Sequence, residues 1–239
     1  MKILQFLLKV RQSRRLGLRV KTARIFRNWA EKLHSSSSHR RASRYQIVVD
    51  ACRSPRVFQI LEIGTCTGAT ALYMILAAKS VGDPNRVEYW GFDLFEQFVP
   101  ESFASGETKP PVSSAEVEQM LCRMTGISKD RLHLIVGDTR KMLRGWLDKM
   151  PKMDVIFIDG GHSAEVVRED WNWCKQLMHA GTRCFFDDYT PRPNYGIMAV
   201  VNDIARSKVY GVRVHEVPKD KFDDYIHRIA EVWLRHDEY

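Results

Sequence analysis

Residues 57–81 read VFQILEIGTCTGATALYMILAAKSV, and this stretch decides the fold. An apolar run typical of a buried strand (57–63) leads into a turn with Gly64 and Gly68, and an apolar helical segment (69–81) follows at once. A strand, a glycine turn and a helix in this order are the opening unit of a parallel sheet covered by helices. The free N–H groups at the start of such a helix face whatever lies beyond the end of the strand.

The same alternation of strand-like and helix-like segments continues along the chain. Further strands are expected at 88–95, 131–138, 154–159 and 183–188, and helices at 114–124, 140–150, 164–178 and 197–207. Two β-rich runs, VRVHEVP and IHRIAEVWLR, come last and are expected to form a hairpin-like pair at one edge. The pattern therefore predicts a doubly wound α/β domain with a mostly parallel, seven-stranded sheet.

Polar residues end these strands at one edge of the sheet. Gly64, Asp93, Asp138, Asp159 and Asp187 each follow an apolar run. Any one of the acids could simply cap the next helix. Because ligands of open α/β sheets bind beyond the carboxyl ends of the strands, five such residues at one edge favour a ligand site.

Three of the acids suggest a metal ion. Asp187 and Asp188 are adjacent, and they can face the same point only where the strand has ended, which Tyr189, Thr190 and Pro191 indicate. With Asp159 from the neighbouring strand they would form an all-oxygen site, suited to a hard ion such as Mg2+. Zinc is disfavoured, because neither cysteine nor paired histidine spacing is present.

Three motifs carry a resemblance to a known family. The form E-x-G-x-x-x-G, from Glu62 to Gly68, is similar to motif I of class I, Rossmann-like methyltransferases that use S-adenosylmethionine (SAM). A dinucleotide fingerprint would instead need glycine where Cys66 and Ala69 stand. Together, LEIGTCTGATA, FIDGGHSAEVVREDW and FFDDY resemble the metal-dependent O-methyltransferases of the macrocin type, which methylate sugar hydroxyls, and more distantly catechol and caffeoyl-CoA O-methyltransferases.

The resemblance implies roles for individual residues. Mg2+, or another hard divalent cation, would be held by Asp159, Asp187 and Asp188, and His162 would be the general base. SAM would be bound by Glu62, Gly64, Thr65, Gly68, Asp93, Asp138, Thr139 and Asp159. Catechol enzymes have lysine where His162 stands and asparagine as the last metal ligand, so a catechol acceptor is less favoured than a sugar or glycoside.

Two of these roles have ordinary structural alternatives. Asp93 could accept hydrogen bonds from ribose hydroxyls, and capping of a helix explains it about as well. His162 could be a helix-start residue bonded to a nearby carbonyl. A hydroxyl acceptor has to lose a proton, however, and an imidazole three residues after Asp159 favours the role of base.

The charge of the chain is divided unevenly. The formal charge is +8, yet residues 1–45 hold 13 Lys or Arg and one acid, which leaves the remainder acidic. We therefore expect a basic helical arm and Ser-rich hinge at 1–43 and a methyltransferase domain at 44–239. Residues 1–33 have a helical apolar stripe that would pack on the domain or on a partner subunit, as in a homo-oligomer; docking on an anionic membrane is the alternative.

The sequence as a whole predicts Mg2+-dependent transfer of a methyl group from SAM to a hydroxyl of a small acceptor, in a cytoplasmic or membrane-peripheral protein. A catechol or phenol O-methyltransferase is the alternative within enzymes. A nucleic-acid methyltransferase anchored by the basic arm is less favoured, since no N-P-P-Y-type motif is present and nucleic acid is not expected as a partner. A non-catalytic SAM-binding module is a further alternative, which would not require His162 or the three acids of the predicted metal site.

Overall fold

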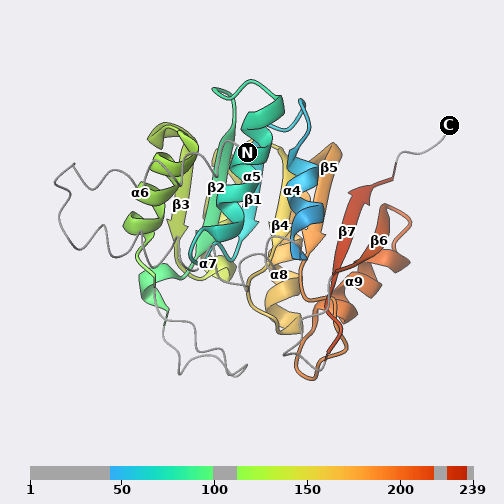
Figure 1. Ribbon diagram of the computed structural model, residues 1–239. Helices are drawn as coiled ribbons and strands as arrows, with labels where there is room; N and C mark the ends of the chain where they lie inside the picture. The colour runs from blue at the N-terminus through green and yellow to red at the C-terminus, as the bar shows by residue number, and fades with distance from the viewer. Residues whose placement is uncertain (1–43, 99–111, 218–224, 236–239) are drawn as a thin grey trace. The chain divides into compact units, whose positions relative to one another are not determined.

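The computed structural model describes residues 44–98, 112–217 and 225–235. Within these ranges the chain forms one seven-stranded sheet with helices on both faces (Figure 1). The strands are β1 (Gln59–Ile63), β2 (Glu88–Asp93), β3 (Leu132–Val136), β4 (Met153–Ile158), β5 (Met178–Phe186), β6 (Tyr210–Glu216) and β7 (Arg228–Leu234). The predicted fold class is confirmed. The predicted basic arm lies outside the described residues and stays a prediction.

The helices follow the strands as the sequence pattern predicts. They are α4 (Gln46–Cys52), α5 (Ala69–Val81), α6 (Ser114–Thr125), α7 (Thr139–Trp146), α8 (Ala164–Cys174) and α9 (Ile197–Arg206). Figure 1 shows α4 and α5 in front of the strands, while α7, α8 and α9 pack on the opposite face. The helix α4 was not predicted, because its seven residues, about two turns, are too few to show a period.

The order of the strands explains where ligands can bind. The sheet runs β3-β2-β1-β4-β5-β7-β6, so the chain starts in the middle, builds outward to β3 and then crosses back to β4. The first five strands are parallel, and β7 runs antiparallel between β5 and β6 (Figure 1). The switch point lies between β1 and β4, where crevices form in such sheets.

The predicted strand boundaries are corrected at β5. It begins at Met178, where the sequence predicts the end of a helix, and α8 stops at Cys174. The register irregularity between Met153 and Val155 of β4 accompanies this early start. At its other end β5 stops at Phe186, so Asp187 and Asp188 follow the strand as expected.

The central strands β1 and β4 are mostly apolar and buried because both faces of the sheet are covered there. Buried Leu61 and Ile63 face one layer of helices with Ile156 and Ile158 of β4, and Trp171 of α8 packs against the same core. Parallel strands covered on both faces read as continuous apolar runs, which is why they are visible in the sequence. Among the described residues no helix is long and apolar enough to cross a membrane.

Candidate active site

A cleft opens at the carboxyl ends of the parallel strands, at the switch point between β1 and β4. Its walls come from the turn after β1, the ends of β2 and β3, and the turn after β4. It is lined by Ile63, Gly64, Cys66, Phe92, Asp93, Leu94, Phe95, Phe98, Val112, Gly137, Asp138, Thr139, Arg140, Asp159, Gly160, Gly161, His162 and Val166. Six of the residues predicted to form the site therefore share one cleft: Gly64, Asp93, Asp138, Thr139, Asp159 and His162.

The turn after β1 is fitted tightly against the turn after β4. Gly64 has φ +92°, and a Cβ atom there would lie 2.0 Å from the carbonyl oxygen of Asp159. The Gly64 amide donates to the carbonyl of Phe92 at 2.8 Å, which ties the turn to β2 as well. Only glycine permits both this φ and this close approach, so Gly64 sets the spacing between the two sides of the cleft.

Asp93, at the end of β2, holds the cleft wall together. Its carboxylate accepts from the amide of Cys66 at 2.7 Å through one oxygen and from the amide of Phe95 at 2.9 Å through the other. Cys66 has φ 48°, a conformation that such an acceptor helps to fix. Asp93 therefore supports the wall through two backbone amides, and it also lines the cleft.

Asp138 is both a helix cap and part of an ion pair. It accepts from the Arg140 amide at the start of α7, and its two oxygens also receive the Arg140 guanidinium, one of them at 2.6 Å. These bonds lower the pKa of Asp138. Thr139 is the first residue of α7 and lines the cleft beside it.

Glu62, Thr65 and Gly68 lie outside the cleft lining. The buried Glu62 carboxyl receives a hydrogen bond from the Tyr89 hydroxyl, which is also 3.2 Å from the Thr65 hydroxyl. Burial raises the pKa of Glu62 to about 8, against the lowering effect of the Tyr89 hydrogen bond. Gly68 caps α5 with φ 71°. All three residues are buried, so they support the turn from its core-facing side.

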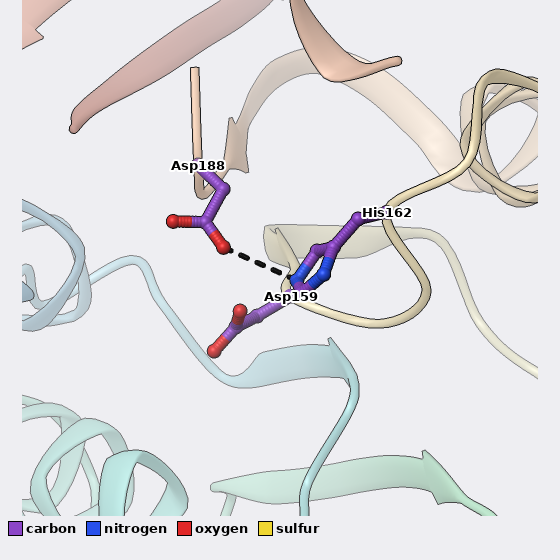
Figure 2. Close-up of side chains that lie close together, drawn as sticks. All are labelled: Asp159, His162 and Asp188. Carbon is purple, nitrogen blue, oxygen red and sulfur yellow. Dashed lines mark ion pairs between the residues drawn. The ribbon is translucent and has the colours of Figure 1, made fainter. Parts of the chain in front are cut away.

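The turn after β4 and the end of β5 bring two acids and an imidazole together. Figure 2 shows Asp159, His162 and Asp188 side by side, and each offers one ligand atom within 4.8 Å of the other two. His162 Nε2 lies 3.1 Å from Asp188 Oδ2. The imidazole thus contacts a carboxylate of the same group.

Asp187 lies beside this group and shares a hydrogen-bonding partner, Tyr45, with Asp159. Its carboxylate is not in the group of three, and its Oδ2 accepts from the Tyr45 hydroxyl at 2.9 Å. The same hydroxyl lies 3.3 Å from Asp159 Oδ2. Asp188 has φ 52°, so the backbone turns sharply after the strand, and this turn lets both adjacent acids face the site.

His162 is held by the segment that precedes α9. The Gly196 amide donates to the His162 carbonyl at 2.7 Å, and the Tyr195 ring stacks on the imidazole with 4.3 Å between centroids. Ser163 caps α8 immediately after it, accepting from the Val166 amide. The ring of His162 is therefore fixed by stacking and by its link to Asp188.

Three residues that the sequence analysis did not assign to the site contact it. Tyr45 precedes α4, Tyr195 lies in the connection to α9, and His227 precedes β7, with its Nδ1 2.6 Å from Asp188 Oδ1. A signal for His227 existed: a residue just before a strand antiparallel to β5 lies at the carboxyl end of β5. Reading that signal requires knowing that β7 pairs with β5, which the hairpin prediction did not include.

A buried carboxyl lies beneath the cleft. Asp170 of α8 is fully buried, and neither of its oxygens has a hydrogen-bond partner among the described residues. Burial raises its pKa to about 7, an effect that the nearby Thr139 hydroxyl partly offsets. A Cβ atom on Gly160 would be 3.5 Å from one of these oxygens, so Asp170 lies directly under the glycine pair that precedes His162.

Comparison with known proteins places the chain among methyltransferases. A family model described as a methyltransferase domain matches residues 61–189, which is more than half of the chain. No curated protein sequence matches it.

Solved structures match the fold at low sequence identity. The O-methyltransferase NovP is 15% identical with a TM-score of 0.61, over 81% of this chain and 79% of that one. CalS11, a calicheamicin methyltransferase, is 16% identical with a TM-score of 0.60, over 99% and 92%. An O-methyltransferase from Bacillus cereus, in complex with SAH, is 17% identical with a TM-score of 0.58, over 92% and 94%. At these identities the likeness shows a common fold.

Proposed function

Because the chain belongs to the methyltransferase-domain family, we propose that it transfers a methyl group from SAM to a hydroxyl of a small acceptor, with a hard divalent cation such as Mg2+. The observation that carries this proposal is the group of Asp159, His162 and Asp188 at the rim of the cleft. A base and two carboxylates beside a cofactor-sized cleft are what removal of a hydroxyl proton requires.

The cleft suits SAM better than a phosphate-bearing cofactor. Its turn carries Cys66 where a pyrophosphate would require glycine, and its lining residues include Phe92, Phe95 and Phe98. Apolar and aromatic walls with a few polar groups are typical of sites for such ligands. Thr139 and the Asp93 and Asp138 carboxylates supply polar contacts at the far wall.

The acid cluster fits a divalent cation. Two carboxylates and one imidazole offer ligand atoms within 4.8 Å of one another, and Asp187 adds a third carboxylate nearby. Asp159 and Asp188 would hold the ion, with Asp187 close enough to join them. When bound, Mg2+ would make the acceptor hydroxyl more acidic and stabilise the developing alkoxide.

In the proposed reaction His162 accepts the proton of the acceptor hydroxyl. The O–H bond breaks, the oxygen forms a bond to the methyl carbon, and the S–CH3 bond of SAM breaks to leave S-adenosylhomocysteine. Such an in-line displacement depends mainly on positioning, which the stacked Tyr195 ring and the Asp188 contact provide for the imidazole.

A sugar or glycoside is the proposed acceptor class. Support comes from His162, which stands where catechol enzymes have lysine, and from Asp188, which stands where they have asparagine. A catechol or other phenol is the alternative acceptor. The structure of NovP and that of the calicheamicin methyltransferase CalS11 share the fold with this chain.

The test is transfer of labelled methyl from SAM to a panel of sugars, glycosides and phenols, with EDTA and with Mg2+ added back. We expect transfer to a sugar hydroxyl that EDTA abolishes and Mg2+ restores. His162→Ala should lower turnover by roughly 10²- to 10⁴-fold while SAM binding and the circular dichroism spectrum are retained. Activity that is insensitive to the chelator would remove the metal from the mechanism.

A further inference from the structure

Two side chains from outside the segment shared with the methyltransferase family reach the acid cluster. The family match covers residues 61–189, whereas Tyr45 precedes it and His227 follows it. Each contacts a carboxylate of the proposed cation site. Neither residue belongs to the three sequence motifs that carry the resemblance to O-methyltransferases.

His227 acts on Asp188. Its Nδ1 lies 2.6 Å from Asp188 Oδ1, while His162 Nε2 lies 3.1 Å from the other oxygen, so one carboxylate stands between two imidazoles. The side chains of His227 and Asp188 are 9% and 10% exposed, which leaves little room for water to replace the contact. The two contacts together fix the rotation of the Asp188 carboxylate.

Tyr45 acts on the other two acids. Its hydroxyl donates to Asp187 Oδ2 at 2.9 Å and lies 3.3 Å from Asp159 Oδ2, so one phenol spans the ends of β5 and β4. The ring of Tyr45 packs edge-on against Phe157, 5.4 Å between centroids, which holds the hydroxyl in place. Since the hydroxyl carries one proton, it offsets only part of the repulsion between two carboxylates.

We propose that His227 and Tyr45 are positioning residues that orient Asp188 and the Asp159–Asp187 pair for the divalent cation. This inference rests on the proposed function. Carboxylates that ligate a metal are usually hydrogen-bonded by a second layer of residues, and loss of such a partner commonly weakens metal binding by about 10- to 100-fold. Because both residues lie outside the shared segment, this chain supplies that layer from its own flanking elements.

The experiment measures Mn2+ affinity, by electron paramagnetic resonance of the free ion, and SAM affinity by calorimetry, on the full chain. His227→Ala should weaken Mn2+ binding by about 10- to 100-fold with SAM affinity unchanged. His227→Asn should restore part of the affinity, because its amide can reach Asp188 with a donor near the position of Nδ1. Tyr45→Phe keeps the ring on Phe157 and should weaken Mn2+ binding to a smaller extent.

A matched control comes from the opposite end of the sheet. His179 at the start of β5 pairs with Asp154 of β4 at 3.0 Å, which is also a histidine–aspartate contact but lies far along the strands from the cluster. His179→Ala should leave Mn2+ affinity unchanged. Thermal unfolding of each variant separates loss of metal binding from loss of fold.

The outcomes distinguish this inference from the proposed function. Wild-type affinity for Mn2+ in folded His227→Ala and Tyr45→Phe would overturn the inference alone. Weak binding in both variants, in a protein that methylates no hydroxyl, would support the inference and count against the proposed function. A wild-type protein that binds no Mn2+ would overturn the inference together with the metal dependence.

Discussion

The two halves of the cleft hold their carboxylates by different means. At the ends of β2 and β3, Asp93 accepts two backbone amides and Asp138 pairs with Arg140, so both are held by the turns that form the cleft wall. At the ends of β4 and β5 the acids contact side chains from distant parts of the sequence, including Tyr45 and His227. The first half resembles a rigid wall, and the second an assembled group of ionisable side chains.

The difference separates a structural use of acids from a chemical one. A carboxylate that accepts backbone amides cannot turn without breaking the turn that it caps. A carboxylate between two imidazoles holds no backbone turn in place, and its remaining lone pairs can bind a cation at little cost to the fold. Substitutions in the first half should therefore affect stability, and those in the second should affect turnover.

The largest expected effect tests the spacing between the halves. Gly64→Ala places a methyl group 2.0 Å from the Asp159 carbonyl oxygen at φ +92°, and should destabilise the protein by about 4 kcal/mol or more. Chemical denaturation measures the change. Gly126→Ala is the control: its φ is +66° with nothing within 4 Å of the new atom, so only the backbone strain of about 1 kcal/mol is expected. Equal losses in the two variants would contradict the close-contact argument.

The next effect concerns the buried carboxyl of Glu62, in β1 behind the cleft. The pKa of Glu62 is raised from 4.5 to about 8 by burial, so folding favours the protonated form. Its contribution is complete below pH 4.5 and is lost as the pH rises through about 8. Glu62→Gln keeps an acceptor for Tyr89 and removes this loss.

Denaturation measured between pH 5 and pH 9 checks the Glu62 prediction. Relative to the wild type, Glu62→Gln should gain about 4 kcal/mol of stability between pH 5 and pH 9. A difference between the two proteins that does not change with pH would show that the carboxyl titrates normally.

A paired substitution compares the halves directly. Asp93→Asn turns one acceptor oxygen into an NH2 group that faces a backbone N–H, and should cost about 1–3 kcal/mol of stability. Asp188→Asn should cost less than about 1 kcal/mol, because asparagine tolerates φ 52° and an imidazole can change tautomer to match it. Asp188→Asn should nevertheless lower methyl transfer, because an asparagine oxygen can still reach the cation but brings no negative charge to it. A larger loss of stability in Asp188→Asn than in Asp93→Asn would contradict the proposed difference between the two halves of the cleft.

The smallest expected effect concerns the Tyr195 ring. Tyr195→Leu removes the stacking on His162 and should lower turnover by about 3- to 10-fold, equivalent to about 1 kcal/mol, with SAM affinity unchanged. Steady-state kinetics with the best acceptor of the panel measure this. Unaltered turnover would mean that the Asp188 contact is sufficient to orient the imidazole.

The sequence predicts the parallel part of the fold because the physical signals there are local. Each strand is an apolar run, each helix follows at once, and the acids at 93, 138, 159 and 187 mark the carboxyl edge. The turn after β5 could be inferred from Tyr189, Thr190 and Pro191. A cleft bounded by these residues follows from the topology rule for open α/β sheets.

The remaining parts of the site depend on contacts that no local pattern records. His227 reaches Asp188 because β7 lies between β5 and β6 in the sheet. The β propensity of the residues in β7 does not determine which strands it pairs with. Tyr45 reaches the acids across more than a hundred residues of sequence. Glu62 belongs to the recognised motif, yet its side chain supports Tyr89 and lies outside the cleft.

The late position of β7 in the chain has a consequence for biosynthesis. A ribosome that has made residues 44–217 has supplied the five parallel strands and all five acids that lie in the cleft or beside it, but not the strand that pairs with both β5 and β6. Domains begin to fold during translation, so a nascent chain would expose the unpaired edge of β5 until residues 228–234 emerge. Chaperone dependence and premature aggregation are thus expected to be concentrated in the interval before residues 228–234 emerge.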